Sequence, residues 1–141
     1  MEIIAASIAH LENVYELICE LENDVLDKDD FSRIYRENLN DASIHYFLAV
    51  DGQTIIGFAS LHIQKLLHHC ALVGEIQEII IAKNQQGSGA GTALFNKIKE
   101  TATLNNCSLL EVSYGRGREK SHDFYLKQGM TKSHFKFTFK I

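Results

Sequence analysis

Apolar residues follow two different spacings along this chain, and the changes of spacing mark predicted helices and strands. In four stretches they recur three or four positions apart, as on one face of a helix. Six short runs of consecutive or alternating apolar residues are typical of strands. The predicted helices lie at residues 11–21, 31–39, 90–104 and 119–128, and the predicted strands at 3–5, 44–50, 54–66, 72–82, 109–112 and 135–139.

The order of these elements indicates an α/β fold with mixed layers. Asp51-Gly52 separates the strands at 44–50 and 54–66, and a glycine there suits the tight turn of an antiparallel hairpin. A helix separates the strands at 72–82 and 109–112, which we expect to form a right-handed parallel crossover. No repeat or linker divides the sequence, so we expect a single domain over residues 1–141.

Charge and cysteine content narrow the functions that fit this chain. Lys and Arg total 14 against 18 Asp and Glu, a net charge of −4 with no long run of either sign. We therefore expect neither nucleic acid nor a membrane surface as a partner. Three widely spaced cysteines predict reduced thiols and a cytoplasmic location.

A glycine-rich hexapeptide, Gln86-Gly87-Ser88-Gly89-Ala90-Gly91, lies between a predicted strand and a predicted helix. Glycines allow tight turns and close approach of backbone N–H groups, and the first helical turn adds unpaired donors and a positive dipole end. The segment thus predicts a cradle for an anion such as pyrophosphate. A tight connection without any ligand is the alternative, since neither a Walker loop nor a dinucleotide-binding glycine pattern is present.

The hexapeptide matches Gln-x-x-Gly-x-Gly and resembles the acetyl-CoA-binding motif of the GCN5-related N-acetyltransferase (GNAT) superfamily. Phe124-Tyr125, followed by Gly129, resembles a second signature of that family, and the order of predicted elements is similar as well. The resemblance implies a mixed, mostly antiparallel sheet flanked by helices, with acetyl-CoA as co-substrate. It also implies that this chain is an N-acetyltransferase.

Roles for individual residues follow from the same resemblance. The loop would hold the coenzyme's pyrophosphate, backbone N–H groups of the preceding strand would hold the pantetheine arm and polarise the acetyl carbonyl, and Tyr125 would protonate the leaving thiolate. The asparagine that many members carry after the strand at 109–112 is missing, and Arg116 or Arg118 either contacts coenzyme phosphates or belongs to a solvated loop. The residues expected to bind the coenzyme are Ile79, Ile80, Ile81, Gln86, Gly87, Ser88, Gly89, Ala90, Gly91 and Tyr125.

Two carboxylates on the predicted strand 72–82 are candidates for the general base. An alkylamine titrates near ~10.4, so at neutral pH it must lose a proton before it attacks the thioester. Glu75 aligns with the catalytic glutamate of several family members and is preferred, with Glu78 as the alternative or as a contact for the substrate ammonium. Because they are three residues apart, only a bulge would place both on one face of the sheet.

Seven histidines are numerous for this length, and several lie in or beside strands expected to border the acceptor site. Five segments, among them Leu61–Gln64, Gly74–Glu78 and Ser133–Thr138, look like those of the bacterial aminoalkylphosphonate N-acetyltransferases. That resemblance implies an aminophosphonate acceptor and a possible divalent metal, although ordinary surface histidines would fit the pattern too. The expected substrate-binding residues are His62, Gln64, His69 and His134, with Arg33 as a further cationic candidate.

We therefore expect direct attack of a small-molecule primary amine on acetyl-CoA in a ternary complex, with no acetyl-enzyme intermediate. Other acceptors, such as a polyamine, an aminoglycoside or a protein N-terminus, are the first alternative. A catalytically silent acyl-CoA-binding module is the second. The alternating phenylalanines at 135–139 could complete the sheet within one subunit or pair across a homodimer.

Overall fold

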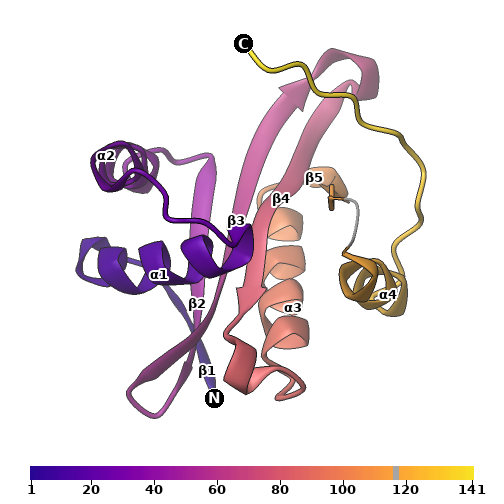
Figure 1. The fold of residues 1–141 in the computed structure, drawn as a ribbon. Coiled ribbons are helices and arrows are strands. Elements are labelled where there is room, and N and C mark those ends of the chain that lie inside the picture. Colours follow the sequence, from indigo (N-terminus) through magenta and orange to yellow (C-terminus); the bar gives the residue numbers. More distant parts are fainter. Residues whose placement is uncertain (116–117) are drawn as a thin grey trace. The chain divides into compact units, whose positions relative to one another are not determined.

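Five strands form one sheet in the order β1-β2-β3-β4-β5, with helices on both faces (Figure 1). The computed structural model describes residues 1–115 and 118–141. Short 3₁₀ helices occupy Ile8–His10, Leu67–His69 and Lys83–Gln85. The strands are β1 (Glu2–Ala5), β2 (Ile44–Asp51), β3 (Thr54–Leu66), β4 (Ala71–Ile81) and β5 (Cys107–Val112), and the helices are α1 (Leu11–Glu22), α2 (Lys28–Leu39), α3 (Ala90–Leu104) and α4 (Glu119–Lys127).

Strands β1 to β4 are antiparallel, whereas β5 follows β4 in the same direction. The β2–β3 hairpin turns at Gly52, whose φ of 62° is the conformation that glycine adopts without strain. The Ser108 hydroxyl of β5 donates to the Leu72 carbonyl of β4 over 3.5 Å, and Leu110 lies beside Gly74. From Leu72 to Gly74 on β4 and from Ser108 to Leu110 on β5, the residue numbers rise in the same direction, so the two strands are parallel. With α3 between these adjacent strands, the expected α/β fold with a β4-α3-β5 crossover is confirmed.

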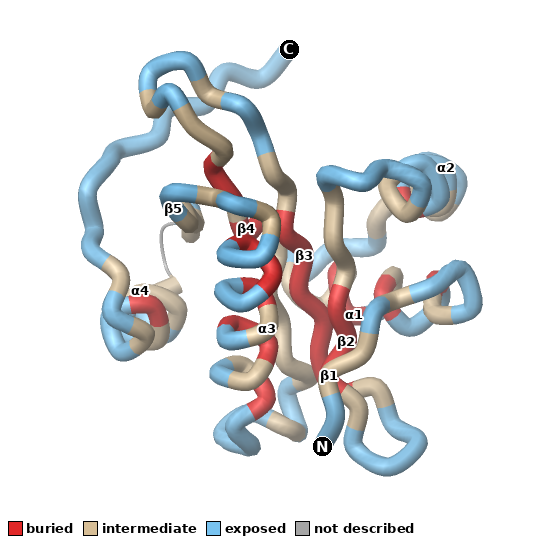
Figure 2. Tube along the Cα trace, turned by 180° about the vertical axis from the view of Figure 1, so that it is seen from behind, coloured by how far each residue is buried: buried red, intermediate tan, exposed pale blue. Residues whose placement is uncertain are grey.

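Helices α1 and α2 cover one face of the sheet, and α3 covers the other (Figure 1). On the first face, α1 packs its apolar stripe against Leu48 of β2 and Phe58 of β3. On the second, Leu94 of α3 lies next to Gly57, and Ala102 lies next to Gly74. Burial is therefore concentrated in the middle strands and the inner side of α3 (Figure 2).

The chain divides into two compact units, Met1–Glu111 and Val112–Ile141. The second unit contains α4 and a tail, residues 130–141, that has neither helix nor strand. Whether residues 1–141 act as a single domain remains a prediction. Within the described residues, no helix has the length and apolar character needed to cross a membrane.

The strand predicted at 135–139 is wrong. Phe135, Phe137 and Phe139 are each at least 90% exposed, and the sheet contains only β1 to β5 among the described residues. Alternation records which side chains share a face, but a strand also needs a neighbour for its backbone hydrogen bonds. Residues 135–139 have the alternation, but the described residues provide no neighbouring strand for them.

Candidate active site

A β-bulge in β4 sets the geometry of the candidate site. Ser60 of β3 pairs with Glu78, but the next residue of β3, Leu61, pairs with Ile76. Gln77 is therefore an extra residue on β4 with no counterpart on β3. One extra residue reverses the alternation of side chains in the rest of the strand.

The bulge places both candidate carboxylates on the same face of the sheet. Glu75 lies opposite His62, and Glu78 lies opposite Ser60. Directly paired residues of antiparallel strands share a face, and so do residues two apart on one strand. All four side chains are therefore on one face, the arrangement that the sequence allowed only with a bulge.

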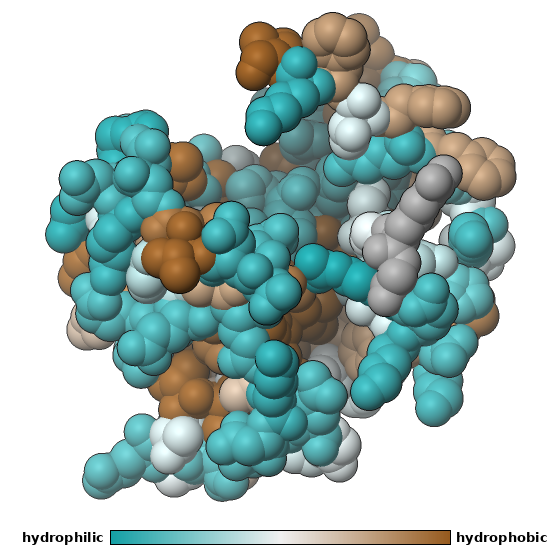
Figure 3. Space-filling view, in the orientation of Figure 1, coloured by the Kyte–Doolittle hydropathy of each residue, from teal (hydrophilic) through white to brown (hydrophobic). Residues whose placement is uncertain are grey.

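A cavity of about 360 Å³ lies on this face, under α1 and α2. Of the expected catalytic and substrate-binding residues, Glu78 and His62 line it, whereas Glu75 and Gln64 are not among its lining residues. On the side of α1 and α2 the surface is mainly hydrophilic, with apolar atoms visible between the polar ones (Figure 3). The cavity is lined by Val14, Ile18, Leu26, Phe31, Ile34, Tyr35, Asn38, Tyr46, Phe58, His62, Gln77 and Glu78.

Hydrogen bonds fix the polar groups of the cavity. The Ser60 hydroxyl donates to Oε2 of Glu78, and the backbone N–H of Glu78 donates to the same hydroxyl oxygen over 3.1 Å. Asn38 Nδ2 donates to the Tyr46 hydroxyl oxygen over 2.6 Å. Burial raises the pKa of Tyr46; the Asn38 bond opposes that shift, and the nearby charge of Glu78 adds to it. Tyr46 therefore stays protonated at neutral pH.

Aromatic rings connect α1 and α2 to the sheet beside this cavity. Tyr15 meets Phe31 edge-on at 5.1 Å, Phe31 stacks on Tyr35 at 6.1 Å, and Tyr35 stacks on Tyr46 at 5.4 Å. Tyr46 in turn meets Phe58 edge-on at 5.3 Å. Such ring pairs stabilise by about 0.5–1.5 kcal/mol each beyond simple burial, so the cavity has a fixed wall.

The glycine-rich loop has the backbone that an anion cradle requires. Gly87 and Gly89 have φ values of 82° and 86°, and α3 begins directly afterwards at Ala90. The first turn of α3 carries no acidic residue, so nothing there opposes the positive end of the helix dipole. Glu20 of α1 supports the approach to the loop, because its Oε1 accepts a hydrogen bond from the Lys83 N–H over 3.0 Å.

Substituting Gly89 by Ala should weaken acetyl-CoA binding about tenfold, because an L-residue at this φ costs about 1–2 kcal/mol and the loop shifts to relieve it. Gly52→Ala is the matched control: its φ is also positive, and space around it is open, but it lies in the β2–β3 turn. Titration calorimetry with acetyl-CoA should show a raised Kd for the first variant only. Equal Kd values would contradict a role for the loop in binding the coenzyme.

The end of β4 offers its backbone on one side. Residues 79–81 pair with residues 57–59 of β3. On the opposite side, Leu110 of β5 lies beside Gly74 and β5 ends two residues later, whereas β4 continues to Ile81. In the described part of the chain no strand accompanies residues 79–81 on that side. Backbone N–H groups alternate along a strand, and the Ala82 N–H donates to Ile56 of β3, so the N–H groups of Ile79 and Ile81 point away from β3, the side on which an extended ligand such as a pantetheine arm would bind.

Tyr125 belongs to the second unit, where it is buried on α4 with Tyr114 at 6.4 Å and Phe124 at 5.4 Å between ring centroids. Burial raises the pKa of Tyr125 to about 12, against a smaller lowering by Arg118. The hydroxyl is thus protonated at neutral pH, as a proton donor must be. His134 lies in the exposed tail of this unit, and Arg116 lies outside the described residues.

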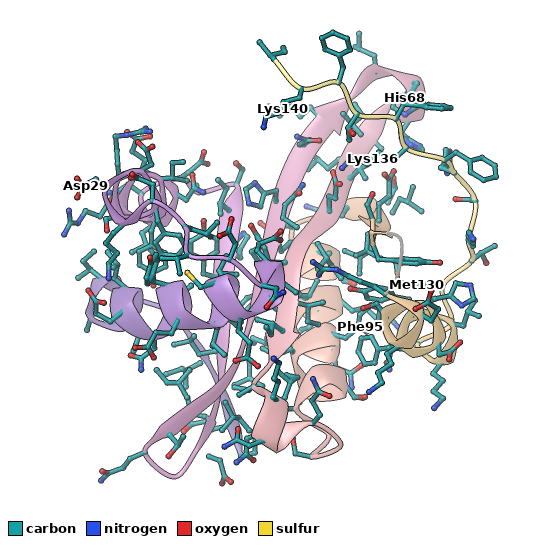
Figure 4. The ribbon with its side chains drawn as sticks, in the orientation of Figure 1. Asp29, His68, Phe95, Met130, Lys136 and Lys140 are labelled. Carbon is teal, nitrogen blue, oxygen red and sulfur yellow. The ribbon has the colours of Figure 1, made fainter. Side chains whose placement is uncertain are left out.

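The candidate histidines of the first unit do not form one cluster, although the ring centroids of His68 and His69 lie 4.3 Å apart. His62 lines the cavity, whereas His68 (Figure 4) and His69 belong to the short 3₁₀ helix at the tip of the β3–β4 hairpin, beyond the last pair of the ladder, Leu66 with Ala71. His69 Nε2 lies 3.5 Å from Oε1 of Glu111. Within residues 1–115 and 118–141, no three His, Cys, Asp or Glu residues form a group able to hold a metal ion. The donor set does not fit the possible divalent metal.

Arg33 is not among the lining residues of the cavity either. It forms ion pairs with Asp30 at 3.5 Å and Glu37 at 3.7 Å on the exposed side of α2, the helix that also carries Asp29 (Figure 4).

Four residues of the cavity region were missed from the sequence: Asn38, Tyr46, Ser60 and Gln77. Ser60 left a signal, since it is the one hydroxyl within the apolar run 55–61. The other three acquire their places from the packing of α2 and from the bulge, which no local pattern encodes.

Comparison with known proteins identifies the family. The model of the acetyltransferase (GNAT) family matches residues 11–130. The chain belongs to the GNAT acetyltransferase family. An aminoalkylphosphonate N-acetyltransferase of Salmonella typhimurium is 37% identical over 137 residues, 97% of this chain and 89% of that protein. The enzyme class predicted from the sequence, an N-acetyltransferase, is thereby confirmed.

Solved structures show the same GNAT fold at low identity. A transcriptional regulator from Bacillus halodurans C-125 superposes with a TM-score of 0.91 at 19% identity, over 99% of both chains. An aminoglycoside 6'-N-acetyltransferase from Acinetobacter haemolyticus superposes with a TM-score of 0.86 at 18% identity, over 100% of this chain and 98% of that one. Identities this low speak for the fold alone. Members of the GNAT family use acetyl-CoA as co-substrate, and the open loop and strand end described above are suited to it.

Proposed function

We propose that this enzyme acetylates the primary amine of a small aminoalkylphosphonate. The observation that carries the proposal is the cavity under α1 and α2, which has one carboxylate, Glu78, and one imidazole, His62, in its lining. Its size suits a small molecule. The relative from Salmonella typhimurium, which is named for the same acceptor class, supports the choice of acceptor.

The reaction is a direct transfer. The substrate ammonium gives a proton to Glu78, and the free amine attacks the acetyl carbonyl so that a C–N bond forms and the C–S bond breaks. Backbone N–H groups of Ile79 and Ile81 polarise the carbonyl, and the coenzyme leaves as a thiolate that receives a proton from Tyr125. The attacking nitrogen gives its second proton to water as the amide forms, and Glu78 and Tyr125 return to their starting protonation states by exchange with water. Glu75 is the second candidate for the base, and its pairing with His62 keeps it near the site.

The substrate's phosphonate would be held by His62 and by neutral donors. Among the described residues, the cavity lining contains no Lys or Arg. The imidazole of His62 provides one hydrogen bond, and the hydroxyl of Tyr46 and the amide of Asn38 provide others. A polycationic acceptor finds one carboxylate in this lining, which gives little attraction to a polyamine or an aminoglycoside.

The proposal is tested by measuring release of free coenzyme A thiol with a panel of amines. Aminomethyl- and aminoethylphosphonate should stimulate release far above the matched carboxylates glycine and β-alanine, and above a polyamine and an aminoglycoside. A parallel series with a chelator tests the metal, and full activity in it would remove any metal requirement. Binding of acetyl-CoA without release by any amine would replace the enzyme proposal with a silent coenzyme-binding module.

A further inference from the structure

The side chain of Ser60 makes both of its described hydrogen bonds with one residue, Glu78. The hydroxyl donates to Oε2 of the carboxylate and accepts the N–H of the same residue over 3.1 Å. Ser60 itself is 0% exposed, so water cannot replace either bond. A hydroxyl has one proton to donate, and that proton is committed to the carboxylate.

The position of Ser60 follows from the bulge. Ser60 is the last residue of β3 that pairs with β4 on the far side of the extra residue, Gln77. The strand pairing is irregular there, and the backbone N–H of Glu78 donates a hydrogen bond to the side-chain oxygen of Ser60. The same hydroxyl thus fixes both the backbone and the carboxylate of Glu78.

We infer that Ser60 is a positioning residue that holds one oxygen of the Glu78 carboxylate and leaves the other, Oε1, to take the proton from the substrate ammonium. The inference rests on the proposed function, because it assigns a task to the proposed base. A glutamate side chain has three rotatable bonds, and loss of the Ser60 hydroxyl frees the last of them. The carboxylate then spends less time in the orientation that the reaction needs.

The first measurement is kinetic and uses a double-mutant cycle. Ser60→Ala should lower kcat about tenfold while the KM for acetyl-CoA stays within about twofold, because a misplaced base costs rate and leaves coenzyme binding intact. In the Glu78→Gln background, the same substitution should have almost no further effect on kcat. A purely structural role for Ser60 would instead lower kcat by the same factor in both backgrounds.

The second measurement does not depend on turnover. In protein carrying ¹³C-labelled glutamate side-chain carboxyls, the Glu78 resonance is the one that disappears in Glu78→Gln. It should shift in Ser60→Ala, which removes the hydrogen-bond donor. Thr101→Val is the matched control, since it removes a buried hydroxyl that donates to the Lys97 carbonyl on α3, far along the chain from Glu78; the resonance should not move there.

The outcomes separate this inference from the proposed function. An unmoved resonance in Ser60→Ala, or a shifted resonance with unchanged kcat, overturns the positioning role and leaves Glu78 as the base. Unchanged kcat in Glu78→Gln overturns the choice of base, and the task of Ser60 falls with it.

Discussion

Glu78→Gln should lower kcat by a factor of about 100 to 10,000, the range by which positioned general bases accelerate reactions. Glutamine keeps the size of the side chain and can still accept the Ser60 hydrogen bond, but it cannot take a proton at neutral pH. The substrate must then enter the cavity as the free amine, which is scarce below about pH 10. Stopped-flow or thiol-release assays at saturating acetyl-CoA measure the loss directly.

The pH dependence adds a second criterion for this variant. The kcat/KM of Glu78→Gln should continue to rise as the pH approaches the pKa of the substrate amine, near ~10.4. The kcat/KM of the unmodified enzyme should reach its plateau at a lower pH. Glu75→Gln is the comparison, because Glu75 shares the face of Glu78 without lining the cavity, and its loss should be smaller. Glu16→Gln, an exposed change on α1, should leave kcat unchanged. A larger loss in Glu75→Gln than in Glu78→Gln would make Glu75 the base.

Ile98→Ala should lower the free energy of unfolding by about 2–5 kcal/mol, the cost of removing a large buried aliphatic side chain from a packed core. Ile98 is 0% exposed on the inner side of α3, the helix that begins at the glycine-rich loop. Leu104→Ala is the control on the same helix, because Leu104 is 75% exposed, and it should change the stability by less than about 0.5 kcal/mol.

Urea denaturation followed by circular dichroism gives both values. Similar urea midpoints for Ile98→Ala and Leu104→Ala would contradict this prediction, because they would mean that the packing of α3 on β3 and β4 contributes little to stability.

Much of the fold could be predicted from local sequence patterns. The hairpin strand at 54–66 and the start of α3 at Ala90 lie where the apolar spacing and the glycines place them. Hydrophobic patterns succeed here because helices cover both faces of the sheet, so the strands appear as nearly continuous apolar runs and the helices as apolar stripes. They failed at Phe135, Phe137 and Phe139, where alternation is present but the described residues provide no neighbouring strand.

The candidate site was only partly accessible from sequence. The loop at residues 86–91 and the pair of glutamates were found, because glycines at positive φ and carboxylates in an apolar strand are local signals. The sequence did not reveal that Glu75 and Glu78 lie on the same face, since this depends on which residue of β4 lacks a partner on β3. Asn38 and Tyr46 meet across α2 and β2, and such a contact between distant elements leaves no mark in either segment.

The extra residue at Gln77 divides β4 into two segments of opposite phase. Before it, odd-numbered residues such as Glu75 face α1 and α2; after it, even-numbered residues such as Glu78 and Ile80 do. The consecutive isoleucines that follow are therefore apolar on both faces, with Ile81 beside Gly57 on the α3 side. A single-residue insertion or deletion between Gln77 and the glycine-rich loop would move the side chains in the rest of β4 to the opposite face of the sheet. The same change at the Asp51-Gly52 turn would affect only the end of the β2–β3 hairpin. The number of residues in this short stretch of β4, as much as their types, determines which side chains face the cavity.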